Sequence, residues 1–139
     1  MTDESLNKTW FVDIDGTIVE HMGDNDVFKI IKEYGDQSHL YEKPIKKSVD
    51  FINQIPKEDT VVLTTAREEN IRDHTIRMLK HFSIRYDRIM FSLRSGPRYV
   101  INDIKPVGVV GNSEPLKMAF AINVERDTGI TKEDLCLSN

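Results

Sequence analysis

The chain has 139 residues and a formal net charge of −4, with 30% charged and 39% hydrophobic residues. This balance is typical of one globular domain over residues 1–139, and it excludes a largely disordered or fibrous chain. The acidic charge argues against a general nucleic-acid binder. No apolar run approaches the roughly 20 residues of a membrane helix, and residues 1–9 lack the features of a signal peptide. The single cysteine, Cys136, cannot form an internal disulfide. From these features together, we expect a cytoplasmic protein without membrane or nucleic-acid partners.

The first part of the chain alternates between buried runs and amphipathic stretches. Residues 10–14 form a β-branched and aromatic run that predicts a buried strand ending in a turn. Two short helices are predicted next, one over 24–35 and one over 44–56, with a glycine or a proline at their ends. A second buried strand is predicted over 60–65, followed by a long amphipathic helix whose apolar positions run through 71–82.

The second part of the chain continues the alternation with shorter elements. Short strands are predicted over 89–91, 99–101 and 107–110, and a last helix over 113–124 begins at a serine cap. Strands that alternate with helices indicate parallel βαβ units. We therefore expect an α/β fold, a Rossmann-like three-layer sandwich with a mostly parallel central sheet covered on both faces. Ligands of such folds bind at the carboxyl ends of the strands.

Two aspartates follow the first predicted strand. Asp13 and Asp15 are two residues apart, so their side chains point to the same side of the strand. Close carboxylates repel each other unless a cation neutralises them or one of them takes a proton. Mg²⁺ suits this role because it is a hard cation that prefers oxygen ligands, and Gly16 would let the backbone approach a ligand closely. A capped turn without chemistry is the alternative interpretation of this segment.

The segment Asp13-Ile14-Asp15-Gly16-Thr17 resembles the first motif, Asp-x-Asp-x-Thr, of the haloacid dehalogenase-like phosphatase superfamily. The resemblance extends over residues 9–105. It implies that Asp13 is the nucleophile that becomes an aspartyl phosphate. It also implies that Asp15 is the general acid and then the general base, and that its backbone carbonyl helps to hold Mg²⁺.

Residues 61–67 look like the second motif of this superfamily, a strand that ends in serine or threonine. The resemblance places the phosphate-binding hydroxyl on Thr65, with Thr64 as the alternative. The helix start that follows offers backbone N–H groups to an anion. Arg67 is a cation near the positive end of that helix, which favours a functional role over a structural one. The residues expected to line the substrate phosphate are Gly16, Thr17, Ala66 and Arg67.

The third and fourth motifs depart from the superfamily pattern. The third usually supplies a lysine, but residues 91–98 contain none, so Arg94 takes that catalytic place and Arg98 is the alternative. The fourth is an acidic pair after a strand, and here it reads Asn102-Asp103, with Asn102 in place of the commoner aspartate. The metal ligands that the resemblance implies are Asp13, Asp15 and Asp103, with Mg²⁺ as the cofactor.

The function that these motifs favour is an Mg²⁺-dependent phosphomonoester hydrolase acting through an aspartyl phosphate on a small phosphorylated metabolite, such as a sugar phosphate. Residues 86–89 are similar to a stretch in small phosphatases associated with capsular polysaccharide synthesis. Two alternatives remain open: a non-catalytic relative that binds metal or phosphate, and a receiver-like module with a phosphoacceptor aspartate.

A cap over the site would have to come from residues 18–43, which are too few for a large cap domain. We expect a small flap with one helix there. The site is then either open or covered by a neighbouring subunit of a homo-oligomer. The histidines of the long predicted helix, His74 and His81, are expected at its surface or edge, without a metal.

Overall fold

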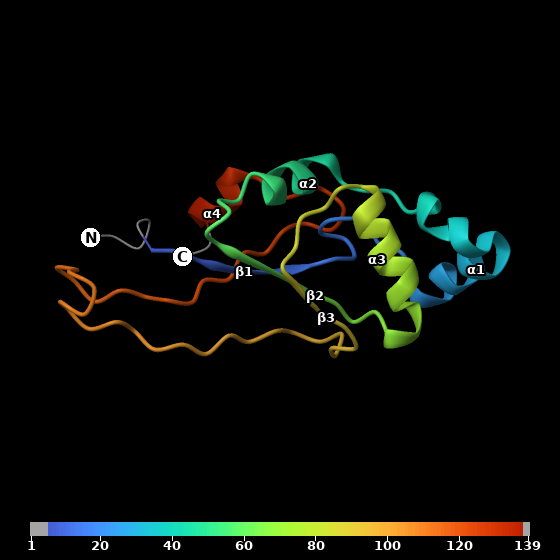
Figure 1. The fold of residues 1–139 in the computed structure, drawn as a ribbon. Helices are drawn as coiled ribbons and strands as arrows, with labels where there is room; N and C mark the ends of the chain where they lie inside the picture. The colour runs from blue at the N-terminus through green and yellow to red at the C-terminus, as the bar shows by residue number, and fades with distance from the viewer. Residues whose placement is uncertain (1–5, 138–139) are drawn as a thin grey trace.

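The computed structural model describes residues 6–137, which fold around a parallel β-sheet (Figure 1). Its strands are β1 (Thr9–Asp13), β2 (Thr60–Thr64) and β3 (Arg88–Met90). The α-helices are α1 (Asp24–Tyr34), α2 (Lys46–Asn53), α3 (Arg72–His81) and α4 (Lys132–Leu137), and the two 3₁₀ helices are η2 (Gly35–Tyr41) and η3 (Glu69–Ile71). No helix within these residues is long and apolar enough to cross a bilayer. The sequence predicted all of the α-helices except α4, and the side chain of Cys136 lies outside the described residues.

The three strands are parallel and lie in the order β1-β2-β3. Asp13 is paired in register with Thr64, and Thr64 with Met90, so all three strands end at the same edge of the sheet. Parallel neighbouring strands require a crossover connection, which is usually helical. The predicted α/β fold with a parallel sheet is therefore confirmed, and the end of β1 lies beside the end of β2.

One face of the sheet forms the hydrophobic core. Alternation along the strands turns Val12, Val61 and Leu63 toward this face, where they are buried. The helices contribute Ile52 from α2 and Met78 from α3 to the same cluster, and Figure 1 shows α2 and α3 on one side of the sheet. Burial of these side chains anchors both the strand ends and the helix that follows β2.

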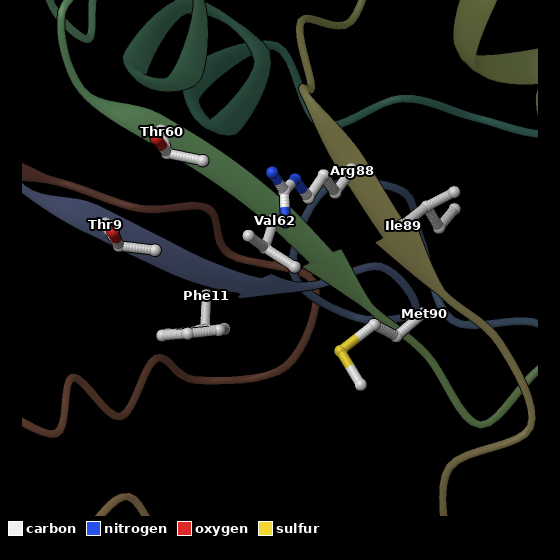
Figure 2. A pocket seen from close by; sticks show the side chains of 7 residues that line it. All are labelled: Thr9, Phe11, Thr60, Val62, Arg88, Ile89 and Met90. Atoms are coloured by element: carbon white, nitrogen blue, oxygen red, sulfur yellow. The ribbon is translucent and has the colours of Figure 1, made fainter.

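The opposite face of the sheet is open. It lines a cavity of about 520 Å³ (Figure 2), and both Phe11 and Met90 are about half exposed there. The helix predicted over 113–124, which would have supplied a covering layer, is not formed. The third layer of the expected sandwich is therefore absent from the described residues, although the fold class is as predicted.

Residues 93–125, here called the arm, replace the predicted strands over 99–101 and 107–110, so those two predictions were wrong. Figure 1 shows the arm running back along the sheet to a tip beyond the amino end of β1 and returning. Lys105 and Leu116 exchange backbone hydrogen bonds of 2.9 Å across its two limbs. At the tip, buried Asn112 accepts a hydrogen bond from Val110 N and donates one to Pro106 O. These bonds hold the two limbs together near the tip, outside the sheet.

Candidate functional site

The carboxyl end of β1 continues into a tight turn that carries both aspartates. Ile18 N donates to Ile14 O at 2.9 Å, and Gly16 N donates to Val19 O at 2.8 Å. Gly16 has a φ of +81°, a conformation that side-chain-bearing residues rarely adopt. Thr17 Oγ1 reaches back toward Asp13 Oδ2 at 3.5 Å. The turn thus holds Asp13 and Thr17 beside each other at the end of the strand, as expected.

Asp13 lies beside a cation from the arm. Arg98 Nη2 is 3.6 Å from Asp13 Oδ1. Burial raises the pKa of Asp13 above its usual value; Arg98 opposes this rise, while the charge of Asp15 adds to it. Arg94 is exposed and forms no such ion pair with Asp13. The structure therefore brings Arg98, the alternative, to Asp13 and leaves Arg94, the residue predicted for this place, exposed to solvent.

Residues of the second predicted motif form hydrogen bonds that hold the loop after β2. Thr65 is fully buried, and its Oγ1 accepts a hydrogen bond from Arg67 N at 3.0 Å. Its own N–H donates to Met90 O at 3.0 Å, which joins this loop to β3. Thr64, the alternative, is the residue paired with Asp13 in the sheet. Both threonines thus lie at the expected edge, with Thr64 beside Asp13 and Thr65 bonded within its own loop. Ala66, which lies between Thr65 and Arg67 in the sequence, is half-buried.

Arg67 is almost completely buried, and its donors are directed into the protein. Nε and Nη2 donate to the two carboxylate oxygens of Asp15, at 3.0 and 2.8 Å. Nη1 and Nη2 donate to Glu42 at 2.8 and 2.6 Å, and Nη1 also donates to Thr75 Oγ1 at 3.1 Å. All five guanidinium N–H groups are therefore used. Arg67 was expected to line the substrate phosphate, but the structure places it behind Asp15, where it orients that carboxylate.

Glu42 connects Arg67 to helix α3. His74 Nε2 lies 2.6 Å from Glu42 Oε2, and Ser38 Oγ lies 2.8 Å from His74 Nδ1. Burial alone would raise the pKa of Glu42, but the hydrogen bonds and charges of Arg67 and His74 lower it to about 2. Because an ionised carboxylate only accepts hydrogen bonds, His74 Nε2 carries the proton in this pair.

Sequence reasoning missed this buried network. His74 was expected at the surface of its helix and is instead buried, so that prediction was wrong. Its spacing of three residues from Ile71 and four from Met78 was the available signal, since both of these are buried in the same helical stripe. Glu42 carried no such signal. It lies at the end of the 18–43 segment, which forms α1 and η2 and closes at its base through a hydrogen bond from Glu20 N to Lys43 O.

Asp103, expected as the third metal ligand, lies in the arm. Its N–H donates to Asn102 Oδ1, and the Asn102 side chain donates to Met118 O. Within the described part of the chain, no group of three or more His, Cys, Asp or Glu side chains is placed to hold a metal ion. The structure therefore brings Asp13 and Asp15 together and leaves Asp103 apart from them. The physical reason is that residues 99–101 do not pair with the sheet that carries Asp13.

The site also contains residues that no sequence pattern singled out. A cavity of about 210 Å³ is lined by Asp13, Asp15, Gly16, Thr17, Val124 and Arg126. Val124 and Arg126 are more than a hundred residues away from the motif in sequence. No local pattern marks such a long-range contact. The small cavity beside the two aspartates is therefore formed partly by the end of the arm and by the residue that follows it.

Comparisons with known proteins add little to this geometry. No protein-family model matches the chain, and no curated protein matches it. Among solved structures, a chain from a Pnkp1/Rnl/Hen1 complex matches with 17% identity and a TM-score of 0.42. The match covers 84% of this chain and 39% of that chain, so this chain spans well under half of its neighbour's length. At this level of similarity, the match carries no argument about fold or activity.

Proposed function

We propose that the protein is an Mg²⁺-dependent phosphomonoester hydrolase that acts on a small phosphorylated metabolite, such as a sugar phosphate. The observation that carries the proposal is the placement of Asp13 and Asp15 at the carboxyl edge of a parallel sheet, with Arg98 Nη2 3.6 Å from Asp13. Asp13 and Asp15 thus offer a carboxylate nucleophile and a second carboxylate in one cavity, and Arg98 adds a cation beside Asp13. Ligands of parallel α/β sheets bind at this edge.

Asp13 is the nucleophile in this proposal. One of its carboxylate oxygens attacks the phosphorus atom while Asp15, as general acid, gives a proton to the leaving oxygen, so that the bond to the leaving alcohol breaks and an aspartyl phosphate remains. Asp15 then accepts a proton from the attacking water, which releases inorganic phosphate and regenerates Asp13. Arg67 donates to both carboxylate oxygens of Asp15 and fixes the orientation of that side chain. Arg98 neutralises charge that develops on the phosphoryl oxygens.

The donor set fits a hard divalent cation. Asp13 supplies a carboxylate oxygen and Asp15 its backbone carbonyl oxygen, and the burial that raises the pKa of Asp13 makes its negative charge costly, which a cation would offset. Mg²⁺ binds through one or two carboxylates and keeps several of its waters, so these two residues would hold it. Asp103 would complete the set only if the arm brings it to them. When bound, Mg²⁺ would neutralise the phosphate and lower the cost of bringing it to Asp13.

The test is phosphate release from p-nitrophenyl phosphate and from a panel of sugar phosphates and nucleotides, with and without Mg²⁺. We expect Mg²⁺-dependent turnover that Asp13→Asn abolishes. Asp50→Asn, which alters an exposed carboxylate on α2, is the matched control and should retain activity. The absence of Mg²⁺-dependent release across the whole panel would contradict the proposal.

A second candidate function is a non-catalytic protein that binds phosphate or metal. The separation of Asp103 from the two aspartates favours it, since the usual third carboxylate is then missing from the site. This candidate predicts binding of phosphate or Mg²⁺ without turnover. A receiver-like module would instead retain a stable phosphate on Asp13 after incubation with a small phosphodonor.

A further inference from the structure

The segment Arg126–Asp127 is fixed against the turn that carries the two aspartates. Asp127 N donates to Gly16 O at 2.8 Å, and His21 N donates to Asp127 Oδ1 at 2.7 Å. Asp127 also adopts a φ of +65°, an uncommon conformation for a residue with a side chain. Two hydrogen bonds on either side of the turn therefore hold this segment in place, and with it the backbone of Arg126.

The side chain of Arg126 lies over Gly16. A Cβ atom placed on Gly16 would be 3.1 Å from Arg126 Cγ and 3.8 Å from its Nε. The absence of a side chain at Gly16 thus leaves the space that the Arg126 stem occupies. From there, Arg126 lines the same cavity of about 210 Å³ as Asp13, Asp15 and Thr17.

Arg126 is the cation in this cavity whose donors are not used by the protein. Arg67 is saturated by Asp15, Glu42 and Thr75, and Arg98 lies against Asp13. Within residues 6–137, the exposed guanidinium of Arg126 has no hydrogen bond or ion pair to another residue. A guanidinium presents its N–H groups in a planar fork that matches the oxygens of a phosphate group.

We infer that Arg126 is an anion-binding residue of this site, and that its ligand is the phosphate group of a phosphomonoester or free inorganic phosphate. The cavity is small, which fits a phosphate group with the rest of the substrate left outside. The inference rests on the proposed function for the identity of the substrate. It goes further by assigning phosphate recognition to a residue outside every motif in the sequence.

The test measures binding of inorganic phosphate by isothermal titration, in the presence of Mg²⁺, for the wild-type protein and for Arg126→Ala, Arg126→Lys and Lys117→Ala. Lys117 is an exposed basic residue on the returning limb of the arm, so its variant loses the same charge at a distance from the cavity. We expect Arg126→Ala to weaken phosphate binding about tenfold or more, because a charge-assisted hydrogen bond is lost. Arg126→Lys should recover part of this loss, and Lys117→Ala should bind like the wild type.

The outcomes separate this inference from the proposed function. Phosphate binding that depends on Arg126, without any turnover, would support the inference and contradict the hydrolase. Turnover with phosphate binding unchanged in Arg126→Ala would contradict the inference alone. Equal weakening in Arg126→Ala and Lys117→Ala would also overturn it, because surface charge would then account for the effect. A wild-type protein that binds no phosphate would overturn it as well. Where turnover is present, Arg126→Ala should raise KM more than it lowers kcat.

Discussion

The substitution Glu42→Gln tests whether the buried network supports the fold. Glu42 is almost completely buried and accepts hydrogen bonds from Arg67 Nη1 and Nη2 and from His74 Nε2. Glutamine keeps the shape of the side chain but removes its charge, so the guanidinium of Arg67 loses one of its two carboxylate partners. Removal of one partner from a buried ion pair costs about 3–5 kcal/mol, because the remaining charge stays buried.

The lowered pKa of Glu42, which arises from the same contacts, leads to a similar magnitude. A decrease from 4.5 in the unfolded chain to about 2 in the folded protein corresponds to about 3 kcal/mol of stabilisation at neutral pH. Both approaches therefore predict a loss of about 3 kcal/mol or more in the free energy of unfolding, measured by urea denaturation. Asp50→Asn removes the exposed ion pair with Lys46 and should cost less than about 1 kcal/mol. A loss in Glu42→Gln no larger than that in Asp50→Asn would refute the reasoning.

Three further predictions follow from the same geometry. The stabilisation from Glu42 should be complete above pH 4.5 and be lost as the pH falls toward 2, because the pKa of Glu42 is lower in the folded protein than in the unfolded chain. Urea titrations at several pH values should show this decrease in the free energy of unfolding for the wild type and not for Glu42→Gln. Gly16→Ala should destabilise the fold by about 1 kcal/mol or more, because alanine disfavours a φ of +81° and its Cβ would crowd the Arg126 side chain. Thermal unfolding would measure the decrease in melting temperature, and an unchanged melting temperature would contradict the prediction. Arg98→Ala should lower phosphatase turnover at least tenfold while Arg94→Ala changes it little, because Arg98 is the residue beside Asp13; the reverse ranking in a steady-state assay would return the role to Arg94.

The sequence was sufficient to predict the three strands that form the sheet, the helices that cross over between them and the turn that carries the aspartates. Those features follow from local patterns, such as the apolar run before Asp13 and the helical spacing after Thr65. It was not sufficient for contacts between distant segments. Nothing near Glu42 indicates that it meets Arg67, and nothing near Arg126 indicates that it lies over the first turn. Such contacts depend on how loops close in three dimensions, which periodicity does not encode.

The arm presents the clearest difference between pattern and structure. Residues 99–101 have the composition of a strand, yet Tyr99 is 87% exposed and Ile101 is 97% exposed. Three flanking residues explain why this composition was misleading. Pro97 lacks a backbone donor, and Pro106 and Gly108 follow within a few residues, so any strand there is short. The arm instead forms bonds between its own limbs, such as those between Lys105 and Leu116.

The proposed metal site with Asp103 as a ligand requires a different position of the arm. For Asp103 to bind the same Mg²⁺ as Asp13, the arm must close toward the carboxyl edge of the sheet from its present open arrangement, in which Tyr99 and Ile101 are exposed. A cation that binds only the closed arrangement stabilises it by mass action. Saturating Mg²⁺ should therefore slow amide hydrogen exchange in residues 99–104 of the wild type.

The variant Asp103→Asn should lose this slowing, because its side chain no longer supplies the anionic ligand that couples the arm to the ion. Asp87→Asn alters a carboxylate near the start of β3 and is the control for charge alone. Slowing in both variants would mean that Mg²⁺ acts without Asp103. Exchange that does not respond to Mg²⁺ in the wild type would leave Asp13 and Asp15 as the whole carboxylate set. The hydrolase would then have to operate with two aspartates and metal-bound water, and the binding-protein alternative would gain the stronger support.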